Sequence, residues 1–370
     1  MTGRDPIEVD GHEGGGGVLR TALGLAVVTG EAVRIDDVRG DRPEPGLKPQ
    51  HVACVDAACA VSDGAAHGDD AGDGVAVGDD TVVFDPGPVG EAVTDRDSLS
   101  VDVGTAGSAT LVCSTVLPAA LVTDTAFRLS VTGGTDVAWS PPADYFGGVT
   151  VELLRSHGLA AALDVPRRGF YPDGGGTVRL TVGPSEPDPI ALRAAVTPDR
   201  IRIAAVATDD LRDADVADRL AREAARRLRN ASVKASVVAC GATYVDAPAT
   251  GAVIVVRAES VMVDGVAMPV AGGSALGEPG VPAERVAREA VEELRKWLTN
   301  DAAVDRYLAD QLVPFLSLVG GAVRIPAVTD HVESAVAVAR TFGFDVRIDE
   351  SPSGSAVVSA DPARTLAGGR

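Results

Sequence analysis

The chain contains very little lysine. Its 370 residues include only Lys48, Lys234 and Lys296, and the formal net charge is −20 because 53 acidic residues outnumber 33 basic ones. Acidic chains with few lysines and many small residues resemble proteins of salt-loving archaea, where molar salt screens the repulsion between carboxylates. We therefore expect a halophilic protein. Because molar salt also weakens the electrostatic part of RNA binding, the negative charge does not exclude RNA, and any RNA contact is expected to be local.

Aromatic residues, long apolar runs and paired cysteines are also scarce. Aromatic residues make up 4% of a chain that is 45% hydrophobic, so valine, alanine and leucine must fill its core. No apolar run approaches the roughly 20 residues of a membrane span, and no secretory signal opens the chain, so we expect a cytoplasmic protein without a membrane partner. The cysteines form no CxxC motif, which argues against a zinc site or a disulfide framework and favours small buried side chains at Cys54, Cys59, Cys113 and Cys240.

A weak internal repeat runs through the chain. Three times, a glycine-rich turn leads into an apolar helix, followed by a strand, a second helix and a pair of strands. We interpret this order as three βαβαββ repeats of an α/β (α+β) fold. The three turn-and-helix segments are EGGGGVLRTALGLAVV (13–28), GTAGSATLVCSTVLPAAL (104–121) and GSALGEPGVPAERVAREAVEELRKWL (273–298).

A different order of elements separates the third repeat from the first two. Residues 186–273 follow a polar, proline-bearing segment and read as strand, helix, strand and strand. We expect them to form a small inserted α/β domain. The large domain would then consist of residues 1–185 and 274–370.

The most distinctive short stretch is GHEGGGGVLR, residues 11–20. Consecutive glycines free the backbone to direct N–H groups at phosphate oxygens, and the apolar helix behind them would add its positive end. The lysine of a P-loop is missing. The stretch therefore predicts an anion-binding loop without naming the anion.

Three further segments could carry chemistry, and each has a structural alternative. His331 follows a Thr329-Asp330 cap at the start of a predicted helix, where an imidazole stays neutral and nucleophilic, although the position by itself favours a capping or packing histidine. Arg39 and Arg42 could grip phosphates with their guanidinium forks or lie on a solvated loop. The run DRYLADQ (305–311) could hold a base and ribose or pack in the core.

Taken together, these motifs resemble those of RNA 3′-terminal phosphate cyclases. The resemblance covers about residues 7–348, and the motifs occur in the family's order. They are EGGGGVLRTALGL, VRGDRPEPGLKPQH, DVGTAGSATL, GGTDVAWSPPADY, RRGFYPDGGG, SALGEPG, YLADQLVPFL and DHVES.

The resemblance implies an ATP-dependent ligase with three βαβαββ units and an inserted domain. In the implied reaction, a histidine takes AMP from ATP and passes it to the 3′-phosphate of an RNA. The neighbouring 2′-hydroxyl then expels AMP and leaves a 2′,3′-cyclic phosphate. The implied partners are ATP, an RNA with a 3′-phosphate end and a divalent metal, Mg²⁺ or Mn²⁺, while the oligomeric state is left open.

The resemblance also assigns roles to residues. His331 matches the nucleophile, and the essential arginines match Arg20, Arg39 and Arg42. Glu13 matches a residue near the metal, and Gln50 matches a residue that binds the RNA substrate. The residues implied to contact ATP are Gly14, Gly15, Gly16, Ser114, Tyr307, Leu308, Ala309, Asp310 and Gln311.

The chain departs from the family pattern at a few positions. Gly17 and Ser114 stand where the family usually has glutamine, and Ser334-Ala335 replaces a Thr-Asn pair. These departures put fine nucleotide contacts in doubt. Two alternatives are a non-catalytic cyclase-like protein of ribosome assembly, which loses the histidine and arginines, and an enolpyruvyl transferase, which shares the repeats but needs no nucleophilic histidine.

Overall fold

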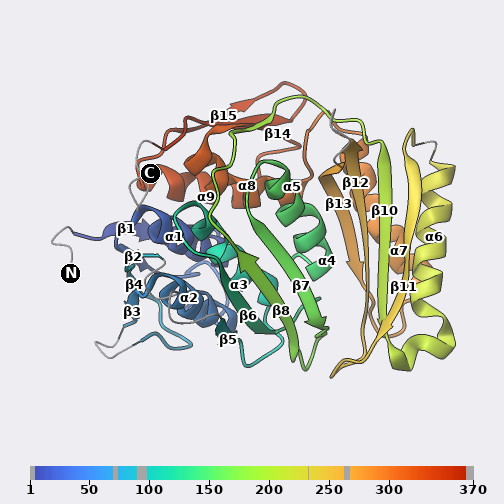
Figure 1. Cartoon of the computed structure of the whole chain (residues 1–370), viewed down its shortest axis with the longest axis horizontal. Coiled ribbons are helices and arrows are strands. Elements are labelled where there is room, and N and C mark those ends of the chain that lie inside the picture. Colours follow the sequence, from blue (N-terminus) through green and yellow to red (C-terminus); the bar gives the residue numbers. More distant parts are fainter. Residues whose placement is uncertain (1–4, 70–73, 90–97, 232, 262–266, 364–370) are drawn as a thin grey trace.

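The computed structural model describes residues 5–69, 74–89, 98–231, 233–261 and 267–363 (Figure 1). Its strands form four sheets of four strands each. All four sheets have two neighbouring parallel strands, then an antiparallel strand, then an outer strand antiparallel to that one. In three of the sheets the strands also stand in the same chain order: first, second, fourth and third. This shared order confirms the three predicted βαβαββ repeats.

The first two repeats follow each other directly along the chain. The first has strands β1 (Ile7–Asp10), β2 (Val33–Asp36), β3 (Ala65–His67) and β4 (Val82–Asp85), with helices α1 (Gly16–Thr29) and α2 (Pro49–Ser62). The second has strands β5 (Leu99–Asp102), β6 (Phe127–Gly133), β7 (Ala161–Arg167) and β8 (Gly176–Val182). Its helical segments are α3 (Ala109–Val116), η1 (Leu117–Leu121), α4 (Ala143–Tyr145), η2 (Phe146–Val151) and α5 (Glu152–Ser156).

The third repeat begins before the insert and ends after it. Its first strand, β9, pairs in parallel with β14, although β9 lies inside the range predicted for the inserted domain. The elements of this repeat are β9 (Ile190–Leu192), α8 (Arg306–Val319), β14 (Gly321–Ile325), α9 (Asp330–Thr341), β15 (Val346–Glu350) and β16 (Ala356–Ala360).

The fourth sheet stands at one end of the molecule, with its helices at the right of Figure 1. Its elements are β10 (Arg200–Thr208), η3 (Asp209–Ala214), α6 (Val216–Asn230), β11 (Ser236–Val245), β12 (Ala252–Val261), β13 (Ala267–Leu276) and α7 (Ala283–Leu298). Helix α7 packs on α6 and β13, so the expectation that it opens the third repeat is wrong, and α8 takes that place. We propose that the insert starts after β9 and includes α7.

Helix α1 lies at the centre of the large domain. It packs against α2, α3 and α9, and it is buried on nearly every side because its sequence is apolar all round. Gly30 ends the helix in the left-handed region, with φ of 69°. This packing places α1 between helices of all three repeats.

Two sequence expectations about the interior can be compared with the fold. Cys54 and Cys113 are buried and Cys59 is half-buried, all three with free thiols, and the side chain of Cys240 lies outside the described residues. None of the described helices combines the length and apolar character required to cross a membrane.

Candidate active site

The glycine loop, residues 11–16, connects β1 to α1 and needs glycine because other elements approach it closely. Gly14 and Gly15 have φ of 82° and 60°, and a Cβ at Gly14 would lie 2.6 Å from Ser334 Cβ on α9. A Cβ at Gly16 would lie 2.4 Å from His51 Nε2 on α2. The loop therefore joins the starts of three helices.

The start of α1 is open to an anion. No side chain caps it, and Gly15 is its N-cap residue. The first N–H groups of a helix have no intrahelical acceptor and carry the positive end of the helix dipole. A phosphate group is a suitable acceptor for them.

Arg20, Asp310 and His331 form one electrostatic cluster. Arg20 is partly buried, and the loss of solvation lowers its pKa, while Cys54 and Asp310 act in the opposite direction. Burial raises the pKa of Asp310 to about 6, although the charges of His331 and Arg20 counteract the shift. The three residues come from α1, α8 and α9, so the fold brings together residues that are about 300 positions apart in sequence.

His331 occupies the first turn of α9, as its sequence context predicted. The Thr329 side chain caps the helix by accepting from the Val332 N–H at 3.3 Å. The His331 side chain is exposed, and its backbone carbonyl accepts from Ser334 Oγ at 3.1 Å. Since Ser334 also lies against Gly14, the first turn of α9 lies at the edge of the glycine loop, and the His331 side chain is open to solvent.

The two arginines of the loop after β2 differ in their surroundings. Arg42 extends over the glycine loop, where its Nη2 would lie 3.1 Å from a Cβ at Gly15. Arg39 has φ of 61° and donates from Nη1 to the carbonyls of Glu44 at 3.0 Å and Gly46 at 2.8 Å. Partial burial and the nearby Arg42 lower the pKa of Arg39. Arg42 is thus placed for a phosphate on the loop, while Arg39 also shapes the backbone beside it.

His51 is a site residue that sequence reasoning did not select. Its Nδ1 accepts from the Lys48 N–H at 3.0 Å, which places the ring proton on Nε2, facing the glycine loop. Burial, together with Arg20, Arg39 and Lys48, lowers the pKa of His51 to about 3. The ring is therefore neutral and packs against the glycine loop at Gly16. The sequence does contain one indication of this role: His51 directly follows Gln50, in the first turn of a helix that begins with proline.

Gln50 links the first and second repeats. Its Oε1 accepts from the Ser108 N–H at 3.1 Å, and its Cβ would lie 3.0 Å from a Cβ at Gly107. Ser108 caps α3, so the turn formed by residues 104–108 lies beside the start of α2. The predicted RNA-binding glutamine is therefore near the glycine loop, one residue before His51.

The predicted ATP-contacting residues on α8 are exposed to different degrees. The Tyr307 side chain is 40% exposed, stands edge-on to Tyr145 at 6.4 Å between ring centroids, and has the Arg306 guanidinium 4.5 Å from its ring centre. Leu308 and Ala309 are buried in the core. Gln311 is held by Thr150 Oγ1 at 2.8 Å and by the Tyr307 carbonyl at 2.6 Å.

Ser114, the remaining predicted contact, is half-buried on α3, and its hydroxyl donates to the Leu111 carbonyl at 2.8 Å. Among the predicted ATP contacts on α8 and α3, Tyr307 is therefore the one whose exposed ring could stack on a base. The hydroxyl of Ser114 is shorter than the family's usual glutamine and is turned back onto its own helix.

Few side chains of the site could bind a metal ion. Glu13 is exposed on the glycine loop, and the described residues contain no cluster of three or more His, Cys, Asp or Glu side chains that could hold an ion. Mg²⁺ is commonly bound by one or two carboxylates together with substrate phosphates and water. Glu13 fits such an ion when a nucleotide is bound.

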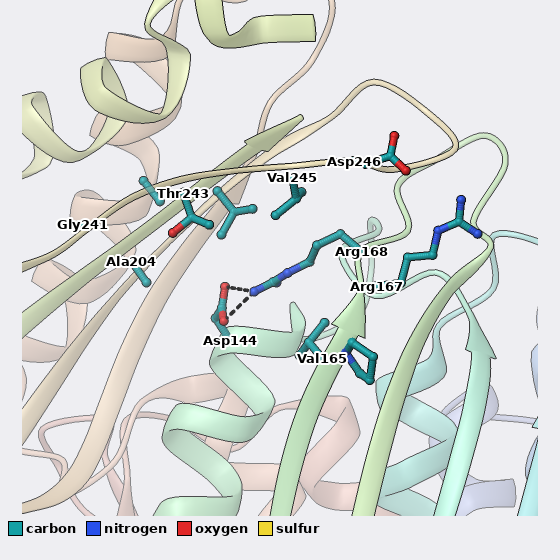
Figure 2. A pocket seen from close by; sticks show the side chains of 12 residues that line it. Asp144, Val165, Arg167, Arg168, Ala204, Gly241, Thr243, Val245 and Asp246 are labelled. Carbon is teal, nitrogen blue, oxygen red and sulfur yellow. Dashed lines mark hydrogen bonds and ion pairs between the residues drawn. The ribbon is translucent and has the colours of Figure 1, made fainter. Parts of the chain in front are cut away.

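Two cavities lie elsewhere, between the second repeat and the inserted sheet. Their volumes are about 610 and 600 Å³, and both include Asp144 and Val165. Figure 2 shows the first, in which Arg168 reaches to Asp144. Neither cavity is lined by any residue of the site described above, so they provide no support for a nucleotide site there.

Comparison with known proteins gives consistent matches over nearly the whole chain. A family model described as RNA 3′-terminal phosphate cyclase matches residues 11–349. The chain is 40% identical to a Halobacterium salinarum protein named RNA 3′-terminal phosphate cyclase, over 95% of this chain and 99% of that protein. It is 40% identical to a protein of the same name from Archaeoglobus fulgidus, over 91% and 95% of the two chains. The corresponding Thermococcus gammatolerans protein is 39% identical, over 91% and 92%.

Proposed function

The chain belongs to the RNA 3′-terminal phosphate cyclase family, and from that membership we propose that it uses ATP to convert an RNA 3′-terminal phosphate to a 2′,3′-cyclic phosphate. In the first step, an imidazole nitrogen of His331 attacks the α-phosphate of ATP. A phosphorus–nitrogen bond forms, and pyrophosphate leaves. We propose that the enzyme acts in the cytoplasm.

Two further steps complete the reaction. An oxygen of the RNA 3′-phosphate attacks the histidine-bound AMP, so the phosphorus–nitrogen bond breaks and an RNA-adenylate forms. The neighbouring 2′-hydroxyl then attacks the activated 3′-phosphate. AMP leaves, the hydroxyl proton is released, and the cyclic ester remains.

The cluster around His331 supports this role. His331 is exposed in the first turn of α9, whose Ser334 lies against Gly14, and it is close enough to Asp310 to influence the pKa of that carboxyl. The Asp310 carboxylate offsets positive charge on the imidazole while AMP is attached to it. The Arg20 cation lies close enough to Asp310 to influence its pKa, and it offsets negative charge on the phosphates.

Other residues position the reactants. Arg42, the uncapped start of α1 and the glycine loop would hold phosphates, and Tyr307 would stack on the adenine. Gln50 would contact the terminal RNA nucleotide. Glu13 would hold Mg²⁺ or Mn²⁺, which when bound supplies charge neutralisation at the phosphates.

Retention of the reactive side chains favours an enzyme over a non-catalytic family member. A protein that served only as an assembly factor would not require a nucleophile together with a partly buried arginine and a partly buried carboxylate near one glycine loop. The cluster of Arg20, Asp310 and His331 is the observation on which the proposal rests.

The direct test is covalent labelling. The chain, incubated in molar KCl with ATP labelled at the α-phosphate, should acquire label that acid removes and base does not, because protonated nitrogen is a good leaving group. The His331→Asn variant should acquire none. His157→Ala is the control, since His157 lies on a different repeat and contacts the Leu153 carbonyl. Undiminished labelling of His331→Asn would exclude the proposed nucleophile.

A further inference from the structure

Exposed aromatic side chains are rare in this chain and are concentrated near the proposed active site. The chain has seven Phe, four Tyr and two Trp residues, and among the described side chains the exposed aromatic ones are Trp139 at 100%, Tyr171 at 76% and Tyr307 at 40%. Tyr307 already has a proposed role at the adenine. Trp139 and Tyr171 have none, and leaving such rings in water is unfavourable for folding.

The loops that carry these two rings run side by side. The Trp139 loop, residues 134–142, follows β6, and the Tyr171 loop, residues 168–175, joins β7 to β8. The Gly169 carbonyl accepts from the Thr135 N–H at 2.8 Å and from the Asp136 N–H at 3.2 Å. Each aromatic residue is therefore within a few positions of the contact between the loops.

Both loops rest on the turn that holds Gln50. The Gly134 N–H donates to the Gly107 carbonyl, and the Pro141 carbonyl accepts from Thr110 Oγ1, both at 2.8 Å. From the other loop, a Cβ at Gly174 would lie 2.8 Å from Ala106 Cα. Gln50 Oε1 accepts from the Ser108 N–H in this same turn. The two loops that carry the exposed rings therefore contact the turn that positions Gln50, the proposed RNA-binding residue.

The Trp139 loop is fastened by an ion pair and holds its tryptophan in an unfavourable backbone conformation. Arg168 is largely buried and bonds to Asp136 of this loop at 3.1 Å. It also bonds to Asp144 at 2.8 Å, as Figure 2 shows. Trp139 has φ of 59°, a region that bulky side chains rarely adopt. Such strain persists only where the surrounding structure enforces it, and it concentrates at functional sites.

We propose that Trp139 and Tyr171 form a stacking platform for the RNA bases immediately upstream of the 3′-terminal nucleotide. The proposal rests on the proposed function and adds how the substrate is held. Every base has an aromatic face, so stacking tolerates any sequence. It also suits a chain with net charge −20, because attraction to phosphates contributes little in molar salt.

A second copy of the chain is a weaker candidate for covering these rings. Two aromatic side chains bury about 150–250 Å² each. Together they supply well below the roughly 800 Å² per partner of a standard protein interface. A single RNA strand, by contrast, needs only one ring per base.

The chain's own tryptophans provide a binding assay that does not depend on turnover. Because the only other tryptophan, Trp297, is 3% exposed, Trp297→Phe leaves Trp139 as the single reporter. Adding a short oligoribonucleotide with a 3′-phosphate, in molar KCl, should quench its fluorescence saturably. The same oligonucleotide with abasic sugars upstream of its last nucleotide should cause little quenching.

Side-chain removal supplies the quantitative test. Trp139→Ala and Tyr171→Ala should each weaken oligonucleotide binding about tenfold, measured by competition with a labelled probe. Trp139→Phe and Tyr171→Phe keep a ring and should retain most of the affinity. Val238→Ala, which removes an exposed apolar side chain on the inserted sheet, should have no effect.

Trp139→Gly separates binding from folding. Glycine accepts the positive φ, so this variant should melt at a higher temperature than the wild-type chain while it binds the oligonucleotide more weakly. A folding defect would lower both properties together.

Two results would overturn the platform. One is unchanged oligonucleotide affinity in both alanine variants, and the other is dissociation of a dimer by Trp139→Ala in sedimentation, which would assign the rings to a second copy. Labelling of the wild-type chain by ATP tests the proposed function separately. A chain that labels at His331 but binds RNA without regard to either ring would refute the platform alone.

Discussion

At the scale of single residues, the guanidinium of Arg42 is the most direct probe of the glycine loop. It extends over Gly15, where a planar fork can make two bonds to a phosphate that an ammonium cannot reproduce. Arg42→Lys should lower the adenylylation rate about 100-fold. Arg226→Lys, on the exposed Arg226–Glu223 pair of α6, should change it less than twofold. Equal effects of the two variants would mean that the guanidinium fork of Arg42 does not bind a phosphate at the glycine loop.

Asp310 should make stability depend on pH. Its pKa is raised from 3.8 to about 6, so the folded state binds this proton more tightly, and stability is lost as pH rises from about 4 through about 6. A shift of about two pKa units lowers the free energy of unfolding by about 3 kcal/mol at pH values above 6. Asp310→Asn should therefore be more stable at pH 7.5 by up to about 3 kcal/mol and no more stable below about pH 4, measured by denaturant unfolding in molar KCl.

The same substitution should impair the reaction, because it removes the carboxylate whose charge interacts with His331. Asp213→Asn, at an exposed aspartate of η3, is the matched control and should alter neither property. If Asp310→Asn destabilised the chain at pH 7.5, the Asp310 carboxylate would stabilise the fold through its interaction with Arg20, and the expected loss of stability on ionisation would be wrong.

Residue-level prediction from the sequence was most successful where a side chain carries a motif. The resemblance selected His331, Arg20 and Asp310, and the fold brings them together. It could not select His51, because that role depends on the Lys48 N–H fixing the ring and on Gly16 lying against Nε2. Contacts of this kind arise from packing between elements that are separate in the sequence.

At the scale of elements, the start of α1 predicts opposite effects at two neighbouring glycines. A Cβ at Gly16 would meet the His51 ring and Arg20, whereas a Cβ at Gly17 would meet nothing within 4 Å. Gly16→Ala should destabilise the chain by about 1–3 kcal/mol and weaken ATP binding. Gly17→Ala should stabilise it by about 0.5–1 kcal/mol, because alanine favours the helix. Thermal unfolding of the two variants decides this, and the same sign in both would show that His51 does not lie under the loop.

The repeats show where element-level prediction succeeds and where it fails. Long apolar helices after glycine turns revealed the three repeats. The start of the third was missed because β9 has three residues, too few to show a strand pattern. Helix α7 was misassigned because its amphipathic sequence fits a helix on any sheet, and only its packing on β13 shows which one it covers.

At the scale of the whole molecule, the net charge of −20 predicts how activity depends on salt. At low ionic strength the carboxylates repel one another and the RNA, and molar KCl shortens the Debye length to about 3 Å. Cyclisation of a 3′-phosphorylated oligonucleotide should therefore rise as KCl increases from tens of millimolar towards molar, together with the folded fraction measured by circular dichroism. Activity that is highest at low salt and declines steadily would contradict the halophilic interpretation.

The parallel pair of β9 and β14 determines the order in which the sheets can form during synthesis. Gly321 pairs with Ile190 across the entire inserted sheet, and β16, which lies between β14 and β15, is the last strand. On the ribosome, the first two repeats and the insert can fold as they emerge, whereas the third sheet must close a long loop afterwards. A nascent chain therefore displays the glycine loop and both exposed rings before His331, the proposed nucleophile, is in place.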